Sequence, residues 1–151
     1  DNTKEANLIM FKKYDHSHQM SCDLLYIDEQ SFNDIPYSAE ELSMRLKKHT
    51  HYNIYIQYIK DVPVGYIGLL EVQNPHYSGV WIDLIAVCKQ YQNQGIAKHM
   101  LELVIKKFKN KGITLSTALV RENNIPSLCV FKKLGYKEEA DAFKLLCLDK
   151  I

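Results

Sequence analysis

One strand–helix–strand segment near the middle of the chain constrains its fold more than any other feature. Residues 80–88 are nearly all apolar, as in a central strand that is covered on both faces. Residues 95–110 then repeat apolar side chains with the period of an amphipathic helix, and residues 113–120 have the composition of a further strand. This order predicts two parallel strands joined by a right-handed crossover.

The turn between the first of these strands and the helix has its own chemistry. It consists of Gln92, Asn93, Gln94, Gly95, Ile96 and Ala97. The first amides of a helix have no intrahelical partner and carry the positive end of the helix dipole, so they attract anions. Gly95 and Ala97 are small enough for a phosphate group to approach the backbone. The turn therefore predicts a ligand that bears phosphate.

The remaining elements follow from hydrophobic periodicity and from start and stop signals. Strands are expected at residues 7–13, 52–60, 64–73 and 139–149, and further helices at residues 17–30, 38–48 and 126–134. A tight turn at residues 61–63 is expected between the second and third of these strands. The pattern predicts a single α/β domain over residues 1–151, in which a mixed, twisted sheet is flanked by about four helices.

The composition argues against several classes of function. The net charge is only +1, which does not favour a nucleic-acid partner. No apolar run reaches the roughly 18 residues of a membrane-spanning helix, and the four cysteines form no C-x-x-C pair, so a cytoplasmic protein without a membrane partner is expected. The pairs His16/His18 and His49/His51 lack a cysteine or carboxylate cluster at ligand spacing, so no metal site is expected.

Three parts of the sequence together resemble the GNAT N-acetyltransferase superfamily. Residues 84–87 and 91–97 resemble its acetyl-coenzyme A signature, Q/R-x-x-G-x-G/A, with Gln92, Gly95 and Ala97 in the three defined positions. Residues 124–136 resemble a later block in which an Asn precedes a helix that ends in K-L-G-F/Y. Residues 28–42 look like the first two helices of family members that acetylate protein N-termini or small amines. The resemblance extends over nearly the whole chain and implies the GNAT fold.

The resemblance also implies a reaction, the transfer of an acetyl group from acetyl-CoA, the co-substrate, to a primary amine. The acceptor would be a small molecule or a peptide, and homodimers are frequent among proteins that resemble this one. No cysteine occupies a reactive position in either motif, so we expect direct attack in a ternary complex rather than a covalent acetyl-enzyme.

The binding of acetyl-CoA is expected along the central strand and the turn after it. The backbone amides of residues 92–97 and the Gln92 side chain would bind the pyrophosphate. The backbone of Ile85 and Val87 would pair with the pantetheine arm as an added strand does, with an N–H near Val87 facing the thioester oxygen. Lys98 either reaches the outer phosphate or is solvated. Asn124 contacts the cofactor, caps the following helix, or does both.

Asp83 is the candidate general base, because it is the one carboxylate within the apolar strand. Strand alternation places it on the face of Trp81, Ile85 and Val87, and burial there would raise its pKa toward a useful value. The alternative is a structural hydrogen bond to a neighbouring strand.

Two other carboxylates, Glu71 and Glu29, are weaker candidates for the base. Together with Asp34 they make the presumed acceptor side mildly acidic, which suits a cationic amine. Phe32 and Tyr37 would either line the acceptor pocket or hold the loop between them in place.

The chain departs from the family at Phe131. The later block usually has a Tyr seven residues after its Asn, where a hydroxyl can protonate the departing thiolate near the bound cofactor. Phe131 has no such proton, so either another group serves or the thiolate leaves unassisted. The same departure keeps open an alternative function, an acyl-CoA-binding regulatory module with little or no turnover.

Overall fold

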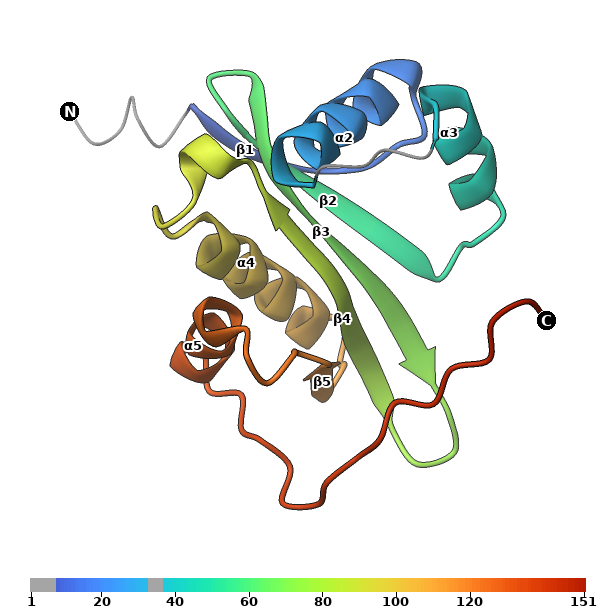
Figure 1. Cartoon of the computed structure of the whole chain (residues 1–151), viewed down its shortest axis with the longest axis vertical. Helices are drawn as coiled ribbons and strands as arrows, with labels where there is room; N and C mark the ends of the chain where they lie inside the picture. Colours follow the sequence, from blue (N-terminus) through green and yellow to red (C-terminus); the bar gives the residue numbers. More distant parts are fainter. Residues whose placement is uncertain (1–7, 33–36) are drawn as a thin grey trace.

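The computed structural model describes residues 8–32 and 37–151. Within this part of the chain the strands form one sheet in the order β1-β2-β3-β4-β5, and Figure 1 shows helices on both sides of it. The strands are β1 (Ile9–Lys13), β2 (Tyr52–Ile59), β3 (Val62–Gln73), β4 (Ser78–Val87) and β5 (Leu115–Ala118). The helices are α2 (His18–Ser31), α3 (Ala39–Lys47), the short 3₁₀ helix η1 (Lys89–Tyr91), α4 (Ile96–Asn110) and α5 (Ile125–Lys133). The fold is the single α/β domain that the sequence predicts.

Local signals in the sequence mark the ends of the helices. The hydroxyls of Ser17 and Ser38 accept hydrogen bonds from the backbone at the starts of α2 and α3. Gly112 and Gly135 follow α4 and α5 with φ of 80° and 93°, the left-handed conformation that glycine adopts at little cost.

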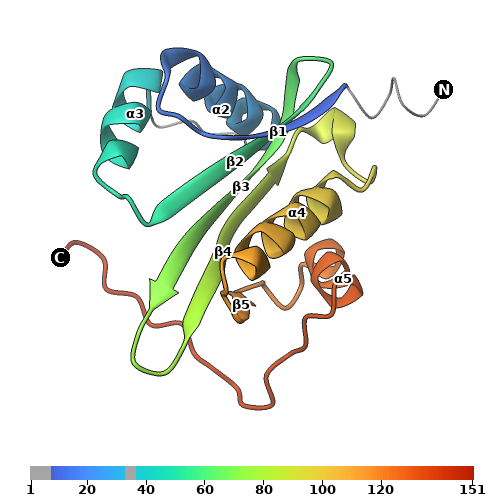
Figure 2. The ribbon, with the colours of Figure 1, turned by 180° about the vertical axis from the view of Figure 1, so that it is seen from behind.

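Each face of the sheet has its own apolar core. Helices α2 and α3 cover one face, and α4 and α5 cover the other (Figures 1 and 2). The core under α4 includes Ile67, Leu69, Val80, Ile82, Met100, Val104 and Phe108. The core under α2 and α3 includes Leu24, Ile27, Ile54, Ile56, Tyr58, Tyr66 and Ala86. Since both faces are covered, the apolar runs of β3 and β4 follow from burial on both sides.

The sheet is antiparallel except where β4 and β5 run side by side in parallel. Their pairing begins at Gly79 and ends where Ile82 meets Ala118, although β4 continues to Val87. The crossover that α4 makes between these two strands is the one that the sequence predicts.

The predicted bounds of the turn between β2 and β3 were wrong. The turn between β2 and β3 lies at Lys60 and Asp61, whose φ values are 50° and 64°, while Val62 and Pro63 already belong to β3. Two residues with positive φ match the right-handed twist of a hairpin, which explains why the turn is shorter than expected.

The strand expected at residues 139–149 is absent from the described structure. This segment runs as an extended trace along the outside of the molecule, and its apolar side chains Phe143, Leu145, Leu146 and Leu148 are more than two-thirds exposed. Its composition favours a strand, but a strand forms only where backbone groups find a neighbouring strand. For the same reason β5, expected over residues 113–120, is confined to the four residues that pair with β4.

Candidate active site

The N-terminus of α4 presents free backbone donors. Gly95 is the N-cap with φ of 79°, and no side chain in the described part of the chain caps the helix. The first helical amides, from Ile96 to Lys98, therefore have no acceptor within the helix. A Cβ atom built on Gly95 would meet no described atom within 4 Å, so the space beside Gly95 is open. This is the arrangement that an anion-binding turn requires.

The side chains of the turn point elsewhere. The Gln92 amide donates to the Val87 carbonyl oxygen at 3.1 Å, which links the turn to the end of β4. The Lys98 ammonium lies 3.7 Å from the Glu102 carboxylate, one turn further along α4. Asn93, with φ of 62°, is exposed beside Gln94. In this structure the donors that face the open space are thus those of the backbone.

The end of β4 leaves one backbone edge without a partner among the described residues. Beyond Ile82 this strand pairs only with β3, up to the contact of Val87 with Gly65. The side chains of Ile85 and Val87 pack against the α4 core, so they anchor the strand while its edge toward β5 remains unpaired. An extended polar chain fits such an edge as an added strand does.

Asp83 lies where the pairing of β4 changes. Gly68 of β3 pairs with Leu84 and Leu69 pairs with Ile82, so Asp83 is an extra residue without a partner, in a β-bulge. Its side chain is exposed and accepts a hydrogen bond of 2.8 Å from the Tyr52 hydroxyl. Tyr52 packs against the core under α2 and α3, so Asp83 faces that side of the sheet.

This placement corrects two expectations for Asp83. It does not share a face with Ile85 and Val87, because the extra residue of the bulge breaks the alternation of β4. It is also exposed rather than buried. Asp83 does accept a structural hydrogen bond, but the donor is Tyr52 of β2, and β2 is not a neighbour of β4 as the alternative expected.

The remaining candidate carboxylates lie apart from one another. Glu71 is 3.7 Å from the Lys111 ammonium at the end of α4, on the sheet face opposite Tyr52. Glu29 is exposed near the end of α2, and Phe32 is 42% exposed one residue after the helix. The structure therefore separates Glu71 from the acceptor side that the sequence suggested.

Tyr37 connects to a buried carboxylate that sequence reasoning missed. Its hydroxyl donates to Asp28, which is 6% exposed and also accepts a hydrogen bond of 2.6 Å from Tyr66. Burial raises the pKa of both tyrosines, so they remain donors at neutral pH. Tyr37 thus ties the segment before α3 to α2, whereas Asp34 lies outside the described residues. A signal existed, because Asp28 follows Leu24 and Ile27 on the apolar stripe of α2.

The later block contributes mainly to packing. The Asn124 side chain caps α5 by accepting from the Ser127 amide at 3.3 Å. Phe131 is 8% exposed and packs edge-on against Tyr136, with ring centroids 4.9 Å apart. Tyr136 in turn shares a hydrogen bond with the Ser116 hydroxyl. Phe131 is therefore a core residue under α4 and α5.

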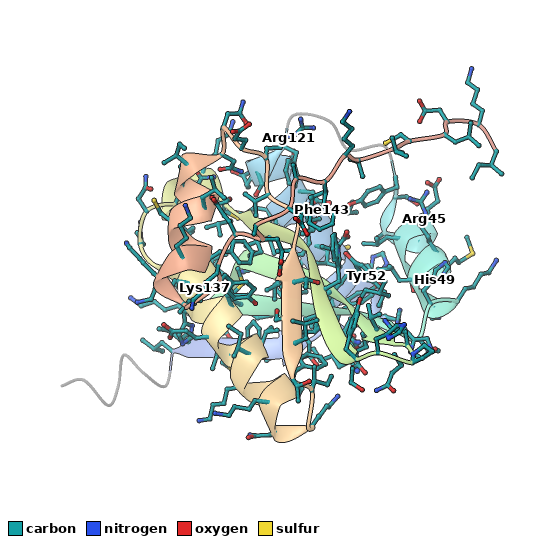
Figure 3. The ribbon with its side chains drawn as sticks, turned by 90° about the horizontal axis from the view of Figure 1, so that it is seen from below. Arg45, His49, Tyr52, Arg121, Lys137 and Phe143 are labelled. Atoms are coloured by element: carbon teal, nitrogen blue, oxygen red, sulfur yellow. The ribbon has the colours of Figure 1, made fainter. Side chains whose placement is uncertain are left out.

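A cavity of about 170 Å³ lies beside Tyr52, between β1, β2 and the end of α3. It is lined by Lys13, Tyr14, His16, Leu46, Lys47, His49, Thr50, Tyr52, Asn53 and Ile54. Figure 3 shows His49 and Tyr52 on the same side of the molecule. His16 and His49 border this cavity. Within residues 8–32 and 37–151, however, no group of three or more side chains that could hold a metal ion occurs. Every helix in the same ranges is too short or too polar to span a lipid bilayer.

Comparisons with known proteins identify a family and structures of similar fold. The model of the acetyltransferase (GNAT) family matches residues 17–136. No curated protein matches the sequence significantly. Among solved structures, the aminoglycoside acetyltransferase meta-AAC0020 from an uncultured soil metagenomic sample, in complex with sisomicin, superposes with a TM-score of 0.80 at 14% identity, covering 96% of this chain and 99% of that one.

Two further structures have the same fold. The aminoglycoside N-acetyltransferase AAC(6')-Iy in complex with CoA has a TM-score of 0.70 at 15% identity, covering 92% of this chain and 94% of that one. A ribosomal-protein-alanine N-acetyltransferase from Brucella melitensis biovar Abortus 2308 has a TM-score of 0.72 at 10% identity, covering 92% of this chain and 99% of that one. At such identities the likeness concerns the fold.

Proposed function

Because the chain belongs to the acetyltransferase (GNAT) family and uses acetyl-CoA as its co-substrate, we propose that it acetylates a primary amine by direct attack in a ternary complex. The observation that carries the proposal is the continuity of two binding surfaces. The unpaired edge of β4 ends at Val87, and η1 leads from there to the open N-terminus of α4 at Gly95. The first surface suits the pantetheine arm, and the second suits the pyrophosphate.

We propose the following roles for the chain's own groups. The backbone amides from Asn93 to Lys98 bind phosphate oxygens, and the backbone near Val87 donates to the thioester oxygen. The Gln92 amide, expected among them, instead donates to the Lys89 carbonyl oxygen. The Gln92 side chain holds the turn against β4. The Lys98 ammonium and the free side-chain amide of Asn124 provide donors at the rim, where both residues are exposed.

The reaction itself requires one bond to form and one to break. The amine nitrogen attacks the thioester carbon, the new N–C bond forms, and the C–S bond breaks. We propose that Asp83 accepts the proton which the amine loses. Phe131 has no proton to give, so CoA leaves as a thiolate and takes its proton from solvent.

A covalent acetyl-enzyme is disfavoured by the state of Cys88. This residue lies directly after β4, close to the proposed site, but it is fully buried. Burial raises the pKa of its thiol, which keeps the thiol protonated and a poor nucleophile. Direct attack by the amine needs no such group.

The acceptor that we propose is a cationic amine on a small molecule or a peptide. Related folds include enzymes that are named for aminoglycosides and for a ribosomal protein, so both classes are candidates. Glu29, Phe32 and Tyr37 lie around the end of α2, on the sheet face that Asp83 also faces, where they would meet the acceptor.

The test is a steady-state assay of thiol release from acetyl-CoA with a panel of amines. The panel contains aminoglycosides, polyamines, peptides with free N-termini and peptides with internal lysine, and mass spectrometry identifies the acetylated product. Saturable, amine-dependent release supports the proposal and names the acceptor class. Saturable binding of acetyl-CoA without release for any amine would instead favour the acyl-CoA-binding regulatory module.

A further inference from the structure

We propose that Tyr52 is a positioning residue for Asp83, reaching it across β3 through a gap that Gly68 leaves open. The proposal rests on the role of Asp83 in the proposed function. It concerns the hydroxyl of Tyr52, which donates to the Asp83 carboxylate at 2.8 Å.

The two residues lie on strands that are not neighbours. Tyr52 begins β2 and Asp83 lies in β4, while β3 runs between them. The Tyr52 ring must therefore cross over β3 to make this hydrogen bond. It crosses at Gly68, where a Cβ atom would overlap the Tyr52 hydroxyl oxygen and lie 3.1 Å from Cζ of the ring. The absence of a side chain at Gly68 is what makes the crossing possible.

The crossing point coincides with the irregularity of the sheet. The register of β3 and β4 shifts between Gly68 and Leu69, and Asp83 is the residue left without a partner. A bulged residue is not held by a cross-strand neighbour. The Tyr52 hydroxyl is the one side-chain donor to Asp83 among the described residues, so it is the group that fixes the orientation of this exposed carboxylate.

Tyr52 remains a donor throughout the working range of an enzyme. Burial raises its pKa well above the ordinary value, and the hydrogen bond and the negative charge of Asp83 raise it further. A donor to the charged carboxylate favours the ionised form, which is the form that can accept a proton from the amine. Tyr52 would therefore hold the Asp83 carboxylate in one orientation through this hydrogen bond.

Several other titratable groups surround this pair. Tyr66 of β3 lies close enough that a negative charge on Tyr52 would raise the pKa of Tyr66. Lys13 of β1, His16, Lys47 of α3 and His49 border the cavity that Tyr52 also lines. All of them are unchanged in the variants below, so a comparison of pH profiles isolates the contribution of the Tyr52 hydroxyl.

The experiment compares Tyr52→Phe with Tyr58→Phe. Both changes remove a hydroxyl that donates from β2 to an aspartate, but Tyr58 donates to Asp23 of α2 at 2.6 Å. For Tyr52→Phe we expect kcat to fall about threefold to tenfold and the acidic limb of the pH–rate profile to move to higher pH. The Kd of acetyl-CoA should not change. Tyr58→Phe should leave kcat and the acidic limb as in the wild type.

A second variant tests the gap itself. Gly68→Ala places a methyl group where the Tyr52 hydroxyl lies, so it should reproduce the shifted acidic limb of Tyr52→Phe. The double variant Tyr52→Phe/Gly68→Ala should be no slower than the slower single variant, because both changes remove one interaction. If the reductions in kcat of the two single variants were fully additive in the double variant, the proposal that the Tyr52–Asp83 hydrogen bond depends on Gly68 would be wrong.

Failure of this proposal and failure of the proposed function give different results. If Asp83→Asn loses activity but Tyr52→Phe keeps the wild-type kcat and acidic limb, Tyr52 has no positioning role. If Asp83→Asn itself keeps the wild-type rate and pH profile, the assignment of Asp83 as the base is wrong. Tyr52→Phe introduces no new group, so its kinetics remain interpretable even if Gly68→Ala does not fold.

Discussion

At the scale of single residues, Asp83 combines exposure with a fixed hydrogen bond. Its carboxylate keeps one oxygen available for a proton, because the Tyr52 hydroxyl bonds to the other of its two oxygens. Those properties suit a group that accepts a proton from an incoming ammonium, directly or through a water molecule.

The substitution Asp83→Asn should lower kcat/KM at least about tenfold, since an amide cannot accept the proton that the attacking amine loses. The Kd of acetyl-CoA should stay within about twofold of the wild-type value, because the proposed cofactor contacts lie on the backbone of β4 and α4. Initial rates over a range of pH, with titration calorimetry for binding, provide the measurement. A wild-type rate with an unchanged acidic limb would remove Asp83 from the mechanism.

At the scale of elements, α4 has a positive-φ glycine next to each of its ends. Gly95 precedes the helix with φ of 79°, and Gly112 follows it with φ of 80°. A Cβ on either glycine would meet nothing within 4 Å, so alanine at either position suffers the same backbone strain and no clash. The two positions differ in what lies nearby, since only Gly95 is part of the turn with free amides.

Gly95→Ala and Gly112→Ala should therefore lower the free energy of unfolding by similar amounts, about 1 kcal/mol each. Only Gly95→Ala should weaken the binding of acetyl-CoA, because only Gly95 belongs to the turn whose free amides would bind the phosphates. Urea unfolding and titration calorimetry on both variants make the comparison. Equal Kd values for the two variants would show that the phosphates bind elsewhere.

At the scale of the whole molecule, tyrosine–aspartate hydrogen bonds join α2 to the sheet. Tyr58 of β2 donates to Asp23, and Tyr66 of β3 donates to Asp28. Burial, followed by the hydrogen bond to the carboxylate, raises the pKa of both tyrosines above that of an unfolded chain. Below about pH 10 the two tyrosines are protonated in both the folded and the unfolded chain, so their hydrogen bonds contribute fully to the free energy of unfolding. Above that pH the unfolded chain ionises first, so stability is lost as pH rises.

The free energy of unfolding should accordingly fall from about pH 10 upward, by at most about 1.4 kcal/mol per pH unit for each of the two buried tyrosines. Urea unfolding at several alkaline pH values measures this slope. Tyr66→Phe should be less stable at neutral pH but should show a shallower decline. An equal slope in the variant would mean that Tyr66 ionises normally in the folded protein.

Most helices and strands of this protein could be predicted from the sequence, because the signals that define them are local. Helices α2 to α5, the strands β1 to β4 and the turn before α4 follow from neighbouring residues, because caps, glycine stops and apolar periods act over three or four positions. The family resemblance also rests on such local blocks, and the match over residues 17–136 confirms it. The homodimer and the acceptor stay predictions.

Only the tertiary structure decided the features that depend on residues far apart in the chain. The bulge at Asp83 arises from the register of β3 against β4, which no period within β4 reveals. The contact of Tyr52 with Asp83 spans 31 positions of sequence and needs the gap at Gly68. Residues 139–149 carry the pattern of a strand but pair with none of the described strands, because side-chain alternation is local whereas a strand's hydrogen bonds require a partner elsewhere.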